Sequence, residues 1–381
     1  MCPGLIDIAM EALNNSVLYT GKTFGAEDFK FIGGGSEGTL FAVNSDQKRL
    51  IVKVLKGEPR KDSGEAIYQE FCSGMGDRLS PYLVPTLYAK GSAVIMEYFD
   101  GKDLEKISGS ADEEEQKALR SDMEKAPLGL LEGLKNLHDN GIAHRDIKPA
   151  NLMCNKKGEM AIIDFGSAAK TSLNDLDEPA MRGTPEYFSP ESHTSGILYS
   201  YKKRDIWALG LTILEVLSGK GPVMQRFVKS IRSNYNKGIS EMLLHTLVMQ
   251  DLLGVSPDTG KRQAFIDFIN EEINSLNPPL ANTLLWQELL LGMLNPDCSQ
   301  RFGVDQAIGV AKKMIAPPQI QFNQGYSTPQ APPWPQNQQR NQPQTSPQYY
   351  TQQQGYPQNF GYPNFPSQQQ GMISQQRAQY S

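Results

Sequence analysis

The amino-acid sequence predicts an α+β protein with a small β-rich lobe, a larger helical lobe and a C-terminal tail. Three observations support this fold class. Short apolar runs bounded by turn-forming residues fill residues 28–100, apolar residues recur at helical spacing after Glu113, and the composition changes sharply near Ala316. A chain of 381 residues is long enough for one two-lobed unit and a tail.

The β-rich part contains short segments with the length and composition of strands, separated by turn-forming residues. A longer segment in the same region has the spacing of a helix. The expected strands are Phe29–Ile32, Leu40–Val43, Leu50–Leu55 and Ala93–Tyr98, and the expected helix is Ser63–Cys72.

The second part of the chain is dominated by helical periodicity. Its leucines and isoleucines recur every three or four residues, which places them on one helix face that can pack in a core. The clearest examples are Leu128, Leu131, Leu134 and Leu137, and then Leu209, Ile213, Leu214 and Leu217.

Residues 316–381 form a tail rich in Gln, Pro, Asn, Tyr and Gly, with Arg340 and Arg377 as its only charges. The tail has too few aliphatic residues to offset its conformational entropy, so we expect it to be disordered. Its mixture of polar and aromatic residues indicates a segment that could bind protein partners. Residues 1–27 precede the first expected strand and are interpreted as an N-terminal extension.

The composition limits the partners and the compartment. A net charge of −5 and a pI of about 5.6 argue against nucleic acid as the main partner. Cys2, Cys72, Cys154 and Cys298 are scattered without metal-binding spacing, which indicates reduced thiols. The longest apolar run, Ala208–Leu214, is far shorter than the roughly 20 residues of a membrane span. We therefore expect a cytoplasmic protein with no membrane span. If the source is a pathogen, the cytoplasm in question can be that of a host cell into which the protein is delivered.

The glycines Gly33, Gly35 and Gly38 fit the pattern G-x-G-x-x-G between two expected strands. Glycines allow main-chain N–H groups to approach phosphate oxygens closely. Alone, the pattern is more often a glycine-rich hairpin without a ligand. A strand rather than a helix follows it, which argues against a dinucleotide-binding fold.

Lys53 lies in the middle of an apolar strand, where its charge requires a partner unless it faces solvent at a sheet edge. If it contacts phosphate, a carboxylate on the following helix should hold it. We favour Glu70 as that partner, with Glu65 on the same helix as the alternative.

Two motifs carry a family resemblance. His144–Asn151 reads H-R-D-I-K-P-A-N, and Asp164–Gly166 reads D-F-G. In this order, after a glycine-rich loop and a strand lysine, they resemble the eukaryotic-type (Hanks-type) serine/threonine protein kinases.

The resemblance implies a role for each residue in phosphoryl transfer from ATP with Mg²⁺. Asp146 orients the acceptor hydroxyl and accepts its proton, while Lys148 neutralises the transferring group. Asn151 and Asp164 bind the metal. Lys53 contacts the upstream phosphates.

Further segments extend the resemblance. Glu97 and Phe99 fall in a hinge that pairs with adenine through its backbone, and Gly183–Glu191 resembles the segment that docks protein substrates. Asp205, Glu191 and Arg301 match scaffold positions of the family, with Arg301 expected to pair with Glu191.

The resemblance thus implies a bilobal kinase domain over residues 28–315, with an N-lobe at about 28–96 and a C-lobe at about 101–315. It implies a signalling enzyme that phosphorylates serine and threonine on protein substrates. A pseudokinase scaffold is the alternative, although the chain retains every catalytic residue. A small-molecule kinase is the third reading, and Gly183–Glu191 counts against it.

In many kinases of this type, the arginine before the catalytic aspartate binds a phosphate on the loop after D-F-G. Here that arginine is Arg145, and residues 175–182 contain no Ser, Thr or Tyr. We expect Asp177 or Glu178 to pair with Arg145 instead, so that the enzyme is active without loop phosphorylation.

Overall fold

The computed structural model describes residues 3–16, 23–35, 37–45, 48–57, 63–177, 182–194, 196, 198–236, 238–254 and 260–315. The chain divides into two units, 1–320 and 321–381, and the second lies outside the described residues. The prediction of a disordered tail at 316–381 therefore also lies outside them.

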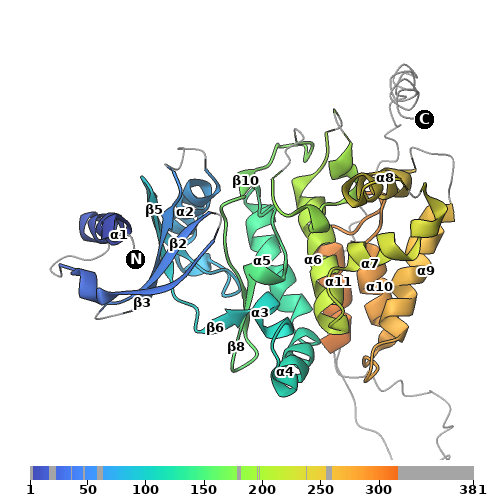
Figure 1. Cartoon of the computed structure of the whole chain (residues 1–381), viewed down its shortest axis with the longest axis horizontal. Helices are drawn as coiled ribbons and strands as arrows, with labels where there is room; N and C mark the ends of the chain where they lie inside the picture. Colours follow the sequence, from blue (N-terminus) through green and yellow to red (C-terminus); the bar gives the residue numbers. More distant parts are fainter. Residues whose placement is uncertain are drawn as a thin grey trace, which may run out of the picture. The chain divides into compact units, whose positions relative to one another are not determined.

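A five-stranded antiparallel sheet forms the N-terminal lobe, in the order β1-β2-β3-β5-β4 (Figure 1). All four expected strands are confirmed. Each contributes to one buried apolar cluster, through Phe29, Phe41, Val43, Leu50, Val52, Val54 and Ile95. The strands are β1 (Phe29–Gly34), β2 (Gly38–Asn44), β3 (Arg49–Leu55), β4 (Thr86–Lys90) and β5 (Ala93–Glu97).

Sequence reasoning did not identify β4. Only Thr86 of its five residues is fully buried, and its last residue is the exposed Lys90. The strand therefore lacks the apolar run that revealed its neighbours. It is held by pairing with β5 and by packing against α2 (Gly64–Met75).

Helix α2 begins one residue after the start that the sequence predicts. The Ser63 hydroxyl accepts the N–H of Ala66 at 3.3 Å and caps the helix. The chain leaves the helix at Gly76, whose φ of 49° is unfavourable for other residues. Tyr68 and Phe71 lie on the buried face, so one side of α2 is fixed against the protein.

The N-terminal extension contains a helix, α1 (Pro3–Asn15), which packs on β3 and β5 (Figure 1). Ala9 and Leu13 are fully buried in the same apolar cluster as Phe41 and Val52. The extension therefore completes the core of the N-terminal lobe.

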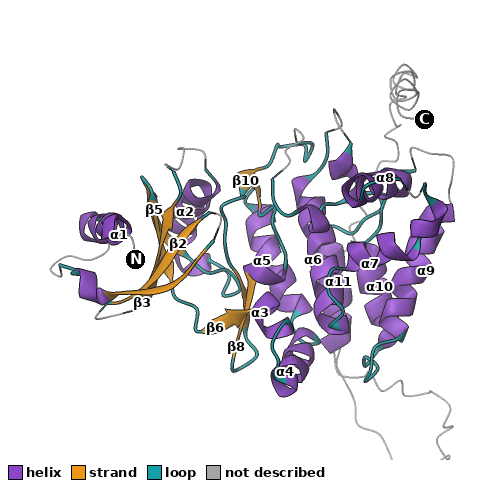
Figure 2. Ribbon diagram, in the orientation of Figure 1, coloured by secondary structure: helices purple, strands orange, loops and turns teal. Residues whose placement is uncertain are grey.

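Helices build most of the C-terminal lobe, with short strand pairs where it meets the sheet (Figure 2). Helix α6 packs against α4, α5, α7, α9 and α10. Ser200 caps the start of α6, and Gly219 ends it in the left-handed region. The elements are β6 (Gly101–Asp103), α3 (Leu104–Ser108), α4 (Glu113–Met123), α5 (Pro127–Asp139), β7 (Ile142–Ala143), β8 (Leu152–Asn155), β9 (Met160–Ile162), β10 (Ala169–Lys170), α6 (Tyr201–Ser218), α7 (Val223–Ser230), α8 (Glu241–Leu253), α9 (Gly260–Asn274), α10 (Thr283–Met293) and α11 (Val304–Ile315).

The expected pair between Glu191 and Arg301 is confirmed and is almost completely buried. The guanidinium donates to both carboxylate oxygens, at 2.6 and 2.8 Å. Its carbon also lies 5.0 Å from the ring centroid of Trp207, which stacks on Phe265. Burial opposes ionisation of Glu191, but Arg301 outweighs it and lowers the pKa of the carboxyl group.

Within the described residues, no single helix has the length and hydropathy of a membrane span. Helices α6 and α7 have the required length and hydropathy only when they are counted as one segment, and the chain bends by 83° between them.

The packing of α1 yields a stability prediction. Leu13→Ala should lower the free energy of unfolding by about 2–5 kcal/mol, because it leaves a cavity in the sheet core. Urea unfolding followed by circular dichroism measures this loss. Ile8→Ala is the control on the same helix, and it should cost less than about 1 kcal/mol because Ile8 is 36% exposed. Equal losses in the two variants would show that α1 does not pack as described.

Candidate active site

Lys53 is the central cation of the site. Strand β3 places it in mid-sheet, opposite Leu40 of β2 and Val94 of β5. Its Nζ donates to Asp164 Oδ1 at 2.8 Å and to Glu37 Oε2 at 3.0 Å. A third carboxyl group, that of Glu65, lies 3.6 Å away. The buried ammonium group is therefore surrounded by acidic side chains from three other segments.

The partner of Lys53 on α2 is Glu65, and the preference for Glu70 was wrong. Five residues along a helix rotate the side chain by about 140°, so the two glutamates cannot face the same neighbour. Glu70 points to solvent and pairs with Lys170 at 3.1 Å. Glu65 shares the buried face with Tyr68, and this pattern in the sequence could have identified it.

Electrostatics reinforce the cluster. Burial favours the neutral amine of Lys53, but Asp164 and Glu37 outweigh it and raise its pKa. The pKa of Asp164 is lowered, because Lys53 outweighs the effect of burial. The pKa of Glu65 is raised by burial, which Lys53 offsets only in part. Lys53 and Asp164 thus hold each other in their charged forms.

The segment after Asp164 is packed tightly against α2. Phe165 stacks on Tyr68, with ring centroids 3.3 Å apart, and meets His144 edge-on at 4.9 Å. Gly64, the first residue of α2, lies directly on this segment. A Cβ there would be 2.2 Å from the carbonyl oxygen of Phe165. Only glycine allows the helix to start so close and to place Glu65 beside Lys53.

The buried Asp205 carboxylate holds the loop that carries Asp146. It accepts the backbone N–H groups of His144 and Arg145 at 2.8 and 2.7 Å, and His138 Nε2 at 3.0 Å. Arg145 has a φ of 66°, which is uncommon for a residue with a side chain. The scaffold role expected for Asp205 therefore has a physical basis, because its carboxylate stabilises this turn.

Asp146 makes contacts with three polar side chains. Thr184 Oγ1 donates to Oδ1 at 2.8 Å, and Asn151 Nδ2 donates to Oδ2 at 3.0 Å. Lys148 Nζ lies 3.1 Å from Oδ2 and also donates to Thr184 Oγ1 at 2.6 Å. In the sequence, Thr184 was noted only as part of the segment Gly183–Glu191. In the structure, its hydroxyl group links Asp146 and Lys148.

The three motif glycines differ in their surroundings. A Cβ at Gly38 would lie 2.5 Å from the carbonyl oxygen of Val54, so the sheet itself requires glycine there. A Cβ at Gly33 or Gly35 would meet nothing within 4 Å. The folded chain does not require glycine at these two positions, which is consistent with a ligand approaching the backbone.

The expected hinge residues Glu97 and Phe99 lie where β5 leads into β6, between the two lobes. Glu97 also pairs with Lys48 through its side chain. A pocket extends between Lys53 and the start of α2, and Met96, the residue before Glu97, lies in its wall. Its lining combines charged and apolar side chains: Lys53, Glu65, Val84, Thr86, Val94, Met96, Ile163, Asp164 and Phe165.

The expected pairing of Asp177 with Arg145 was wrong, and Glu178 lies outside the described residues. Arg145 Nε donates to the carbonyl oxygen of Ser167 at 2.7 Å, and its guanidinium covers the ring of Tyr201. Asp177 is buried and accepts the backbone N–H groups of Ser172 and Tyr201, at 2.7 and 3.2 Å. Its carboxylate therefore holds the loop to the start of α6 through main-chain donors, which no residue pattern reveals.

Comparisons with known proteins agree with this geometry. The family pattern described as "Protein kinase domain" matches residues 26–311. The chain is 36% identical over 204 residues to Mitogen-activated protein kinase kinase 1 of Arabidopsis thaliana, covering 51% of this chain and 55% of that protein. It is 32% identical over 212 residues to the Probable serine/threonine-protein kinase mkcF of Dictyostelium discoideum, covering 55% and 30%.

A third relative is the Dual specificity mitogen-activated protein kinase kinase dSOR1 of Drosophila melanogaster, with 28% identity over 264 residues. That match covers 68% of this chain and 62% of the relative. The chain thus spans between 30% and 62% of the length of these three relatives.

The close approach of α2 yields a prediction that needs no activity assay. Gly64→Ala should lower the free energy of unfolding by about 1–3 kcal/mol, because its Cβ would overlap the backbone after Asp164. Thermal unfolding measures the change. Gly74→Ala is the matched control on the same helix, since a Cβ there meets nothing within 4 Å. It should leave stability unchanged or raise it by up to about 1 kcal/mol. If Gly64→Ala is as stable as Gly74→Ala, the described contact is absent.

Proposed function

Because the chain belongs to the protein kinase family, whose domain pattern covers residues 26–311, we propose that it phosphorylates serine and threonine hydroxyls of proteins, using ATP and Mg²⁺. The expected family and two-lobed fold class are confirmed. The observation that carries the proposal is the intact set of charged groups. Lys53 contacts Asp164 on one side of the site, and Asp146 contacts Lys148 and Asn151 on the other.

On the acceptor side, Asp146 is the general base. Its carboxylate would accept the proton of the substrate hydroxyl as the new bond to phosphorus forms. Thr184 and Asn151 orient it through hydrogen bonds, and Asp205 fixes the backbone before it. Lys148, whose Nζ lies 3.1 Å from Asp146 Oδ2, would neutralise charge on the transferring group.

On the nucleotide side, Lys53 would bind the phosphates upstream of the transferred group. Asn151 and Asp164 would hold a magnesium ion, which prefers oxygen ligands and would neutralise part of the phosphate charge. The amide nitrogen of Asn151 already donates to Asp146, so its oxygen is the atom left for a metal. Glu97 and Phe99 would bind adenine through their backbone, and Gly33, Gly35 and Gly38 would cover the phosphates.

Two alternatives are weaker. A pseudokinase scaffold has no support in the site, because every expected catalytic group is present and paired. A small-molecule kinase is disfavoured by Thr184, which connects the substrate-docking segment to Asp146. Two of the similar proteins are named as mitogen-activated protein kinase kinases and one as a probable serine/threonine-protein kinase, which supports a protein acceptor and a role in signalling.

Several expectations stay predictions: the domain limits of 28–315, the cytoplasmic location, the lack of nucleic-acid partners, and protein partners of the tail.

The proposed roles of Lys53 and Asp146 predict the loss of phosphoryl transfer. Asp146→Asn removes the base and Lys53→Met removes the phosphate-binding cation, so each should lower kcat/KM by at least about 10²-fold. Transfer of labelled phosphate from ATP to a generic protein substrate measures the effect, with circular dichroism to verify folding. Turnover near that of the unchanged protein in either variant would refute the assignment.

The two glutamates of α2 offer a matched comparison. Glu65→Gln removes the charge beside Lys53 and should lower kcat/KM about tenfold or more, because Lys53 loses its buried partner. Glu70→Gln removes the same charge from an exposed ion pair and should change activity less than about twofold. The same transfer assay measures both. A larger loss in Glu70→Gln than in Glu65→Gln would restore the original assignment of Glu70.

A further inference from the structure

Glu37 of the glycine-rich loop contacts Lys53, the residue that the proposed function assigns to ATP phosphates. Its Oε2 lies 3.0 Å from Lys53 Nζ. The same oxygen lies directly above Gly166, since a Cβ at Gly166 would be 3.2 Å from it. The glutamate therefore reaches from the loop onto the segment that carries Asp164.

The loop backbone supports this position. Lys56 N–H donates to the carbonyl oxygen of Glu37 at 3.0 Å, and Gly35 N–H donates to that of Gly38 at 2.9 Å. The contact of Glu37 with Lys53 is thus supported by hydrogen bonds of the backbone at Glu37 and Gly38, and does not depend on a long side chain alone.

An ammonium group has three N–H donors, and two of those of Lys53 already serve Asp164 and Glu37. A phosphate oxygen that contacts Lys53 must replace a carboxylate or crowd against it. Like charges at such distances repel, so phosphate binding favours the departure of one carboxylate.

Glu37 is the carboxylate best able to leave. Its side chain is 51% exposed, whereas that of Glu65 is 10% exposed and fixed on α2. Asp164 has a second donor in the N–H of Gly166, at 3.4 Å. Glu37 belongs to a loop whose glycines Gly33 and Gly35 have open space around them.

We propose that Glu37 is a latch, which occupies the phosphate position on Lys53 when no nucleotide is bound and is displaced by nucleotide phosphates. The inference rests on the proposed function, since it assigns this site to ATP. It makes Glu37 a positioning residue that lowers the affinity for phosphate-bearing nucleotides. Adenosine carries no phosphate, so its affinity should not depend on the latch.

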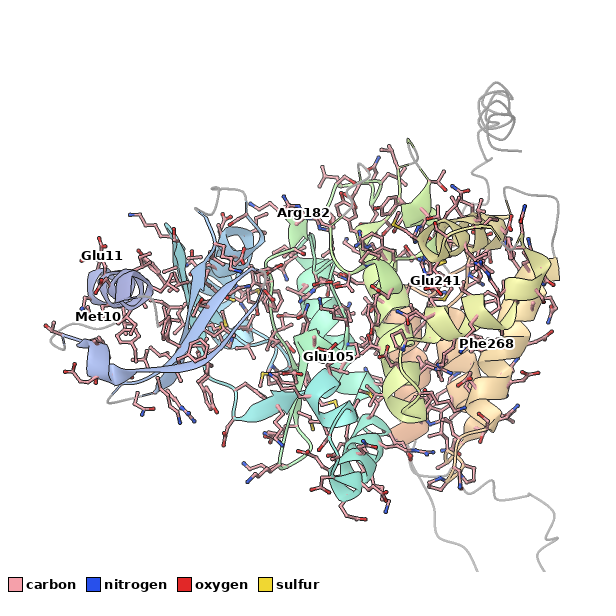
Figure 3. The ribbon with its side chains drawn as sticks, in the orientation of Figure 1. Met10, Glu11, Glu105, Arg182, Glu241 and Phe268 are labelled. Carbon is pink, nitrogen blue, oxygen red and sulfur yellow. The ribbon has the colours of Figure 1, made fainter. Side chains whose placement is uncertain are left out.

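Variants of Glu37 distinguish the effect of losing its contact with Lys53 from the effect of losing its negative charge. Glu37→Gln keeps the length and removes the charge. Glu37→Asp keeps the charge but shortens the side chain by one methylene, which takes the carboxylate out of hydrogen-bond reach of Lys53. Glu11→Gln is the control for charge alone, because Glu11 is exposed on α1 (Figure 3).

Calorimetric titration with a non-hydrolysable ATP analogue, with Mg²⁺, and separately with adenosine tests the latch without requiring catalysis. Glu37→Gln and Glu37→Asp should each bind the analogue roughly three- to tenfold more tightly, the scale of one partly exposed ion pair. Adenosine affinity should stay within about twofold, and Glu11→Gln should match the unchanged protein. Unchanged or weaker binding of the analogue in the Gln and Asp variants would overturn the latch.

Hydrogen exchange in the nucleotide-free protein gives a second readout. The latch predicts faster amide exchange at residues 33–38 in both Glu37 variants, and unchanged exchange there in Glu11→Gln. Equal exchange in all proteins overturns the latch whether or not the chain binds nucleotide. Faster exchange together with no nucleotide binding by any variant would instead refute the proposed function and leave the contact of Glu37 with Lys53 established.

Discussion

The ammonium group of Lys53 joins four parts of the chain that are distant in sequence. Strand β3 carries it, and Glu37, Glu65 and Asp164 bring the glycine-rich loop, α2 and the D-F-G segment to it. A buried cation without partners would be strongly unfavourable, and so would the three carboxyl groups without the cation. The charges therefore contribute to the position of these segments relative to one another, and packing of Gly64 and Tyr68 adds to the position of α2.

A second buried charge organises the acceptor side. Asp205 is fully buried and accepts two backbone N–H groups of the turn that precedes Asp146. Positive φ values at Arg145 and Asp164, of 66° and 60°, store strain at the two ends of the site. Asp205 and Lys53 offset that strain through hydrogen bonds. One carboxylate and one ammonium group thus stabilise the backbone on the two sides of the site.

Local patterns in the sequence were enough to predict much of this arrangement. Continuous apolar runs predicted four strands, and helical spacing placed the start of α2 within one residue. The motifs around Asp146 and Asp164 directed attention to the segments that form the candidate site. The hydrogen bond between Asn151 and Asp146 within it was not predicted. The predicted features succeed because they depend on neighbouring residues or on rigid short loops.

The errors share a different cause, which is the direction of a side chain in three dimensions. Glu65 and Glu70 are both glutamates on α2, and they differ in the face of the helix on which they lie. Asp177 binds main-chain N–H groups of Ser172 and Tyr201, which leave no trace in residue types. Strand β4 is defined by its pairing with β5 rather than by its own apolar content.

The central claim is that the site organised by Lys53 and Asp205 transfers a phosphoryl group to hydroxyl side chains of proteins. The most direct measurement incubates the protein with γ-labelled ATP, Mg²⁺ and a mixed protein substrate, and then identifies the labelled amino acids after hydrolysis. The account predicts label on serine and threonine, and none above background with the Asp164→Ala variant. No transfer by the unchanged protein, or equal labelling by Asp164→Ala, would contradict it.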